Sequence, residues 1–168
     1  MMTGADVVKI VSLFEDAGIA FRVDGGWGID ALVGEPTRPH DDLDLVIDRQ
    51  QNEDAIALLA NQGFSMHVDQ RPVSFILRAA DDRRVDIHPV RFDTDGAGWQ
   101  ALPDGSEFSY TPEGLTGTGT IAGHTVRCLT AELQVACHLG YEPDGSDIHD
   151  MRLLRNRFGV SLPSLYNR

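Results

Sequence analysis

The sequence has almost no lysine, because Lys9 is the single lysine among 14 basic residues. A P-loop needs a lysine directly after its glycine turn to reach the phosphates of a nucleotide, so that type of site is excluded. Lysyl-adenylate and Schiff-base chemistry, which use lysine as the nucleophile, are disfavoured for the same reason. Positive charge at an active site must therefore come from arginine, histidine or metal ions.

Basic residues are also scarce overall, and the formal net charge is −12. Such a charge repels nucleic acids and anionic membranes and favours cationic small molecules. It repels a free nucleotide as well, so nucleotide binding would require metal ions and local arginines. No apolar run approaches the ~20 residues that span a bilayer. The N-terminus lacks the features of a secretory signal, and we expect a cytoplasmic protein.

Cysteine is rare too, with only Cys128 and Cys137 in the chain. We expect two small buried thiols in a reducing compartment rather than a disulfide. Cys137-His138 and His149 have no partners at the spacing of zinc ligands, so a zinc site is excluded.

The apolar periodicity predicts an α+β or α/β fold in one domain over residues 1–168, a mixed sheet flanked by helices. Helices are expected over residues 3–17, 27–33, 51–62, 130–139 and 147–158, with Thr3, Thr130 and Ser146 as caps. Strands are expected over residues 20–24, 43–48, 74–79, 83–88 and 125–129. The stretch 89–123 is expected to form loops, with short strands near residue 108 and over 119–121.

A glycine pair followed by a basic loop is the first candidate site. Gly25 and Gly26 end a predicted strand and open a helix, where backbone N–H groups are available for phosphate. Arg38 and His40, in the loop that follows, would supply positive charge for the same anion.

Two aspartates then begin the next predicted strand. Asp42 and Asp44 are two residues apart, so their side chains share one face of the strand. Asp86 projects from the polar face of a later strand, and if the two strands are neighbours the three carboxylates converge. Such a site would suit two Mg²⁺ ions ~3.5–4 Å apart, with Asp86 as a metal ligand or as general base for an acceptor hydroxyl.

Each of these features has a simpler explanation when taken alone. An isolated Asp-x-Asp is usually a solvated strand end, and a glycine pair is more often a turn than a phosphate cradle. Asp86 could be an edge charge paired with Arg84. Their joint occurrence, in order and on strands, favours the functional interpretation.

These residues resemble a known family. The segments GGWGIDALVG, TRPHDDLD and VDIHP are similar to the antibiotic nucleotidyltransferases of the DNA polymerase beta superfamily. The small lincosamide nucleotidyltransferases are the nearest group and the aminoglycoside 2″-nucleotidyltransferases a more distant one. The likeness continues through IAGHTVRCLT and CHLGYEP, and so covers most of the chain.

The resemblance implies a minimal polymerase-beta-like palm over about residues 1–100, with C-terminal strands and two helices over about 101–168. It implies that Asp42 and Asp44 bind metal and that Asp86 is a metal ligand or the base. The segment that handles the triphosphate, ATP first, corresponds to Gly25, Gly26, Trp27, Arg38 and His40. The superfamily more often has serine where this chain has Trp27, which could stack on a ligand or serve as a core anchor.

Further candidates follow from the same resemblance. Asp30, on the short helix, is expected to hold Arg38 in place. His88 could position the acceptor or a metal-bound water, or make a structural hydrogen bond. The acceptor side is expected to include His138, Tyr141, Asp147 and Asp150, although an acid such as Asp147 is favourable in a first helical turn anyway.

The implied reaction moves a nucleoside monophosphate from a nucleoside triphosphate to a hydroxyl of a small antibiotic and releases pyrophosphate. A lincosamide, with its basic amine, is the first choice of acceptor and an aminoglycoside the second. Two alternatives remain: an enzyme that modifies a partner protein, as in toxin–antitoxin pairs, and a catalytically silent domain that binds nucleotide or ligand. Because the palm is small, a homodimer that shares the acceptor pocket is a further expectation.

Overall fold

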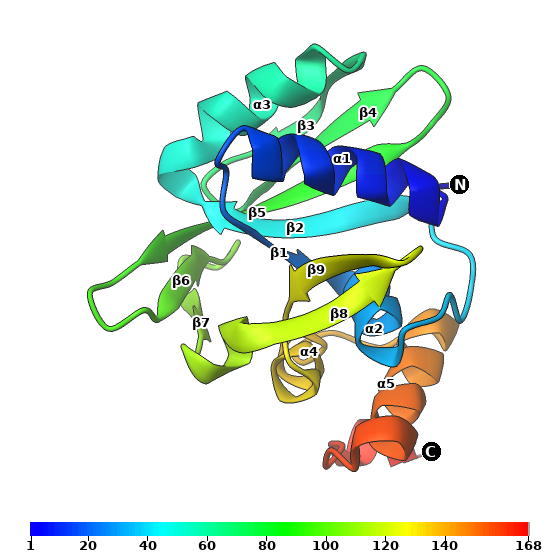
Figure 1. Ribbon diagram of the computed structural model, residues 1–168. Coiled ribbons are helices and arrows are strands. Elements are labelled where there is room, and N and C mark those ends of the chain that lie inside the picture. The colour runs from blue at the N-terminus through cyan, green and yellow to red at the C-terminus, as the bar shows by residue number, and fades with distance from the viewer. Residues whose placement is uncertain (168) are drawn as a thin grey trace.

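The computed structural model describes residues 1–167, which fold around a nine-stranded mixed sheet (Figure 1). Seven strands follow the order β3-β4-β5-β2-β1-β9-β8, and the β6–β7 hairpin extends from β5. The strands are β1 (Phe21–Asp24), β2 (Asp42–Asp48), β3 (Phe64–Gln70), β4 (Ser74–Ala79), β5 (Arg84–Phe92), β6 (Gly98–Ala101), β7 (Glu107–Tyr110), β8 (Gly117–Ile121) and β9 (His124–Cys128). The α+β architecture predicted from the sequence is confirmed.

The helices form two groups (Figure 1): α1 and α3 lie together on one side of the molecule, whereas α2, α4 and α5 lie on the other. Their bounds are α1 (Gly4–Asp16), α2 (Gly25–Val33), α3 (Asn52–Ala60), α4 (Ala131–Cys137) and α5 (Gly145–Phe158). No helix in the described part of the chain is long and apolar enough to cross a membrane.

The alternation predicted for β2 is confirmed. Leu43, Leu45 and Ile47 are fully buried in the core cluster that also contains the apolar stripe of α1. On the opposite face, Val46 joins a second cluster that includes Tyr110 of β7 and Leu133 of α4, and Asp42 and Asp44 are half-buried. The strand therefore anchors itself through one face and offers its carboxylates from the other.

Several boundaries differ from the prediction. The short helix begins at Gly25 rather than at residue 27, with Asp24 as its N-cap. The last helix begins at Gly145 and is capped by Asp144, not by Ser146, because Asp144 and Asp147 form a reciprocal capping box. Strands β3 and β6 were not predicted. β3 is largely exposed, so it shows no clear apolar alternation.

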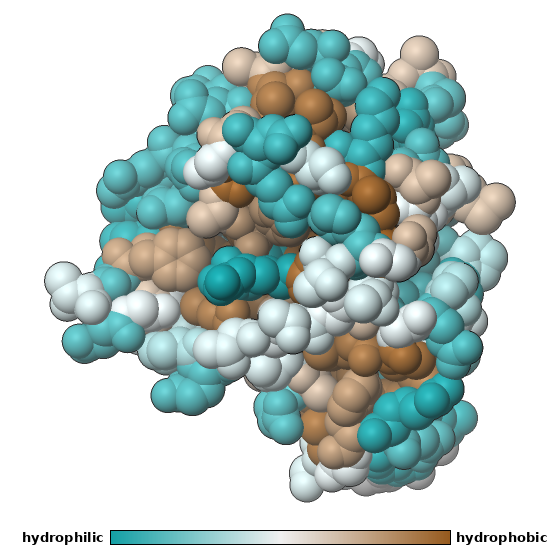
Figure 2. Space-filling model, viewed as in Figure 1, coloured by the Kyte–Doolittle hydropathy of each residue, from teal (hydrophilic) through white to brown (hydrophobic). Residues whose placement is uncertain are grey.

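The surface is unevenly polar. In the view of Figure 2, hydrophilic residues dominate the part over α1 and α3, and hydrophobic residues gather lower, around α2 and α5. A separate small core joins α2, α4 and α5 there, with Ile29, Val135, Met151 and Leu154 all buried. The C-terminal helices are thus packed directly on the helix that carries the glycine pair.

Candidate active site

Three aspartates from three adjacent strands form a row across the sheet. The antiparallel pairing of β1 and β2 places Asp24 opposite Asp44, and the parallel pairing of β2 and β5 places Asp44 opposite Asp86. The predicted neighbourhood of the strands that carry Asp44 and Asp86 is therefore confirmed. Asp24 was not predicted, although its position directly before a glycine pair is a typical N-cap signal.

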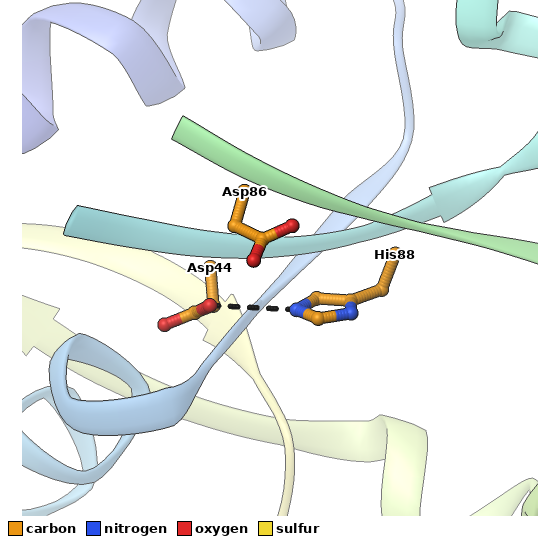
Figure 3. A group of neighbouring side chains, drawn as sticks. All are labelled: Asp44, Asp86 and His88. Carbon is orange, nitrogen blue, oxygen red and sulfur yellow. Dashed lines mark hydrogen bonds and ion pairs between the residues drawn. The ribbon is translucent and has the colours of Figure 1, made fainter. Parts of the chain in front are cut away.

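One set of side chains in the described residues is arranged as metal ligands could be. Single ligand atoms of Asp44, Asp86 and His88 all lie within 4.8 Å of one another. Figure 3 shows the carboxylates of Asp44 and Asp86 on adjacent strands, with the His88 ring turned toward Asp44. Asp42 lies outside this group, two residues along β2 and opposite Arg84 on β5.

The electrostatics of the row favour a cation. Burial raises the pKa of Asp86 to about 6; His88 opposes the shift, while the charges of Asp44, Asp42 and Asp24 reinforce it. Burial also raises the pKa of Asp24 and of Asp42, and the charge of Asp44 adds to both shifts. Carboxylates whose pKa values rise in this way carry mutual repulsion that a bound cation would relieve.

An unpartnered oxygen of Asp86 also indicates that a metal ion fits this site. Oxygen Oδ1 of Asp86 is buried and has no hydrogen-bond partner in the described structure. A buried carboxylate oxygen without a partner is costly, and a divalent cation is the kind of group that would satisfy it. Because the donors are mainly carboxylates, the residues fit Mg²⁺.

His88 is held between the row and the β6–β7 hairpin. Its Nε2 lies 3.4 Å from Oδ1 of Asp44, and its Nδ1 lies 3.2 Å from Nε2 of Gln100. Gln100 also donates from Nε2 to the Val73 carbonyl and accepts from the Tyr110 hydroxyl at 2.6 Å. A carbonyl can only accept, which fixes the amide orientation and makes Gln100 a donor toward His88.

Two effects compete for the charge of His88. Burial lowers its pKa, but the hydrogen bond to Asp44 and the charges of Asp44, Asp86 and Asp24 together outweigh burial and raise the pKa to about 9. The Gln100 N–H opposes this shift, because it points at the nitrogen that a second ring proton would occupy. Gln100 could not be predicted, since β6 lies in a stretch of loop-like composition.

The glycine pair fits closely against the row. Gly25 has φ +58°, and a Cβ there would lie 2.3 Å from Oδ2 of Asp44. A Cβ on Gly26 would lie 2.4 Å from Nδ1 of His40 and 2.7 Å from Nη2 of Arg38. Only glycine permits this approach, so the N-terminus of α2 lies directly beside the carboxylates and the basic loop.

The expected partner of Asp30 was wrong. Asp30 accepts hydrogen bonds from Thr37 and lies 2.6 Å from Nε2 of His40, so it orders the loop through those residues. The carboxylate partner of Arg38 is Asp150 on α5, 112 residues away in the chain. Trp27 is buried in the main core with its ring 4.8 Å from that of His40, as expected of a core anchor.

Of the predicted acceptor residues, His138, Tyr141 and Asp147 lie where α4 passes to α5, whereas His88 lies on β5 and Asp150 is paired with Arg38. His138 ends α4, and its Nε2 is 3.8 Å from Oδ1 of Asp147. The same oxygen accepts a hydrogen bond from the half-exposed Tyr141. The His138 carbonyl in turn accepts from the buried Tyr166 hydroxyl at 2.5 Å. These residues form one connected group, and Asp147 also has the capping role that its position favours.

The sequence model of the family described as aminoglycoside-2″-adenylyltransferase matches residues 6–154. The chain belongs to this family. It is therefore a nucleotidyltransferase of the antibiotic adenylyltransferase type, as the resemblance in its motifs implied.

Individual relatives agree with the family. A lincosamide resistance protein of Staphylococcus haemolyticus is 29% identical over 155 residues, 92% of this chain and 96% of that protein. A 2″-aminoglycoside nucleotidyltransferase of Escherichia coli is 28% identical over 124 residues, 74% of this chain and 66% of its own length.

Solved structures share the fold. The lincomycin-bound lincosamide adenylyltransferase LnuA superposes with a TM-score of 0.82 at 28% identity, over 92% of this chain and 97% of the other. The aminoglycoside enzyme ANT(2″)-Ia, in complex with adenylyl-2″-tobramycin, has a TM-score of 0.71 at 21% identity, over 91% and 87% of the two chains. The nucleotidyltransferase fold predicted from the motifs is confirmed.

Proposed function

We propose that this adenylyltransferase-family enzyme moves the nucleoside monophosphate of a nucleoside triphosphate, ATP first, to a hydroxyl of a lincosamide and releases pyrophosphate. The observation that carries the proposal is the row of Asp24, Asp44 and Asp86, with a buried Asp86 oxygen that lacks a partner. Use of a nucleoside triphosphate fits the cytoplasmic location expected from the sequence.

In the proposed reaction, the acceptor oxygen attacks the α-phosphorus while the bond from that phosphorus to the bridging oxygen of the β-phosphate breaks. The hydroxyl proton passes to the carboxylate of Asp86, which acts as the general base. Asp42, Asp44 and Asp86 would hold Mg²⁺. Bound there, the ions would lower the charge repulsion of the polyphosphate and support the attacking and leaving oxygens.

The glycine pair and the basic loop would bind the triphosphate. Gly25 and Gly26 let the first turn of α2 lie at the edge of the row, where the Gly25 N–H donates to Asp24, and Arg38 and His40 lie against Gly26. Helix N-termini and arginine both favour phosphate. With this assignment, Arg38 and His40 place positive charge at the nucleotide site of a protein whose net charge otherwise repels nucleotides.

A lincosamide is proposed as acceptor because the lincosamide resistance protein aligns over nearly its whole length. The family name and the Escherichia coli relative make an aminoglycoside the second candidate. Both types of drug carry amines, which suit a net charge of −12. His88, Tyr141 and Asp147 are proposed to face the acceptor, and a homodimer that completes the acceptor pocket is part of the proposal.

The test is to incubate the protein with Mg²⁺, each of the four triphosphates and a panel of lincosamides and aminoglycosides, and to measure product masses. A gain of one nucleoside monophosphate on a lincosamide supports the proposal, and Asp44→Asn should abolish it. Drug binding by calorimetry without turnover would indicate a silent domain, whereas labelling of partner proteins instead of drug would indicate a protein modifier. Light scattering with and without drug tests the homodimer.

A further inference from the structure

A buried ion pair joins the basic loop to the last long helix. Nε of Arg38 donates to both oxygens of Asp150, at 3.0 and 3.1 Å, and Nη2 donates to Oδ2 at 2.6 Å. The Asp150 side chain is 2% exposed, whereas that of Arg38 is 26% exposed. One edge of the guanidinium is therefore fixed on a buried carboxylate, while part of the side chain reaches solvent.

Arg38 keeps donors that this pair does not use. Guanidinium has five N–H groups, of which Asp150 takes Nε–H and one from Nη2. The Pro39 carbonyl, 3.3 Å from Nη1, takes a third. One N–H remains on each terminal nitrogen. Nη2 lies only 2.7 Å from where a Cβ on Gly26 would be, so it is packed against the first turn of α2.

We propose that Asp150 is a positioning residue for the triphosphate, because it holds Arg38 beside the N-terminus of α2. The inference rests on the proposed function, since the anion concerned is the triphosphate co-substrate. In a protein of net charge −12, an unrestrained arginine has many carboxylates to pair with. Fixing it before the ligand arrives lowers the ordering cost of binding.

The opposite role for Asp150 would be competition, in which the carboxylate occupies Arg38 and must release it when phosphate binds. The geometry argues against release, because Asp150 is almost fully buried and would be left as an unpaired charge. Arg38 can donate to phosphate from its two remaining N–H groups without leaving Asp150. The two roles predict opposite effects of removing the Asp150 charge.

The experiment measures binding of inorganic tripolyphosphate with Mg²⁺ by calorimetry, together with KM values for ATP and for lincomycin. In Asp150→Asn, tripolyphosphate affinity should fall about tenfold, the size of one lost charge-assisted hydrogen bond. The KM for ATP should rise in parallel, while the KM for lincomycin stays within about twofold. That split distinguishes positioning of the triphosphate from a general loss of structure.

The chain offers a matched control. Arg157 on α5 and Glu35 in the same loop form an exposed ion pair at 2.7 Å, with side chains 53% and 60% exposed. Arg157→Gln removes a link between the same two segments, yet it should leave tripolyphosphate affinity unchanged. Equal losses in Arg157→Gln and Asp150→Asn would overturn the inference, because tethering of α5 would then explain both.

A comparison of two further variants keeps the inference testable if Asp150→Asn folds poorly. Replacing both members of a buried ion pair by apolar residues is often tolerated, so Arg38→Met/Asp150→Leu is compared with Arg38→Met alone. The two should bind tripolyphosphate equally weakly, because Asp150 acts through Arg38. A further loss in the double variant would overturn the inference, as would unchanged or tighter binding by Asp150→Asn. If the wild-type protein binds and transfers nucleotide, either of these results contradicts only the role of Asp150. If the wild-type protein does neither, the proposed function itself fails.

Discussion

Two groups of aspartates, one beside α2 and one that includes Asp30 on α2 itself, differ in how far they are paired. Asp44 and Asp86 have His88 as a shared basic neighbour, and one Asp86 oxygen has no partner in the described structure. Asp30 and Asp150 are fully buried, and each is matched by basic or hydroxyl donors from the loop. The difference teaches that the incompletely paired acids mark where a ligand would contribute charge, whereas the fully paired acids set the position of other side chains.

The largest effect should come from the incompletely paired group of Asp44 and Asp86. Asp86→Asn removes both the proposed base and a metal ligand at nearly constant volume, so turnover should fall by about 10³-fold. The measurement is pyrophosphate release with Mg²⁺, triphosphate and drug. Thermal stability without metal should not fall, because the substitution removes one of the repelling charges. Loss of stability together with activity would show that Asp86 belongs to the paired, structural type.

Metal addition and removal test the same contrast without catalysis. Mg²⁺ at 100 times its dissociation constant should stabilise the folded protein by about 2.7 kcal/mol, since it binds the native site only. Thermal unfolding with Mg²⁺ and then with a chelator measures the shift and its reversal. Asp44→Asn should lose the shift, whereas Arg157→Gln should retain it. A shift that survives in Asp44→Asn would place the cation elsewhere.

The two groups also differ in how much the sequence could predict. Asp42, Asp44 and the later Asp86 stand on strands with regular alternation, and that alternation fixes which face each side chain occupies. Strand pairing then brings Asp44 and Asp86 together. The Arg38–Asp150 pair spans 112 residues, and no local pattern relates a loop arginine to one acid among several on a distant helix.

Errors in the predicted elements have local causes. Asp144, two residues before Ser146, is an equally good N-cap residue. The helix begins after Asp144 because Asp144 and Asp147 exchange two hydrogen bonds in a capping box. β6 lies in a stretch rich in glycine and aspartate, and its residues became a strand through pairing with β5 and β7. The partner of Asp30 was misplaced because His40 and Arg38 are both basic and only two residues apart.

An intermediate effect is expected where the two groups meet, at Gly26. In Gly26→Ala, the new methyl group would overlap His40 and Arg38, and both are held by buried carboxylates, so neither can move cheaply. We expect a loss of about 1–3 kcal/mol in unfolding free energy, typical of overpacking, and weaker binding of Mg²⁺-tripolyphosphate. Denaturant unfolding and calorimetry measure the two. Unchanged affinity in a folded variant would show that phosphate does not approach this turn.

The smallest effect should come from the chain of hydrogen bonds that runs from Tyr110 through Gln100 to His88, which we call the relay. In Tyr110→Phe, Oε1 of Gln100 loses its 2.6 Å hydrogen bond, although Nε2 keeps Val73 and His88. The cost should be about 1 kcal/mol in unfolding free energy, because only one buried acceptor is left unpaired. If the relay also orients His88, kcat should fall a few-fold while Mg²⁺ stabilisation is retained. An unchanged unfolding free energy with a reduced kcat would assign Tyr110 to the reaction itself. If the unfolding free energy and kcat both equal those of the wild type, His88 needs no support from the hairpin.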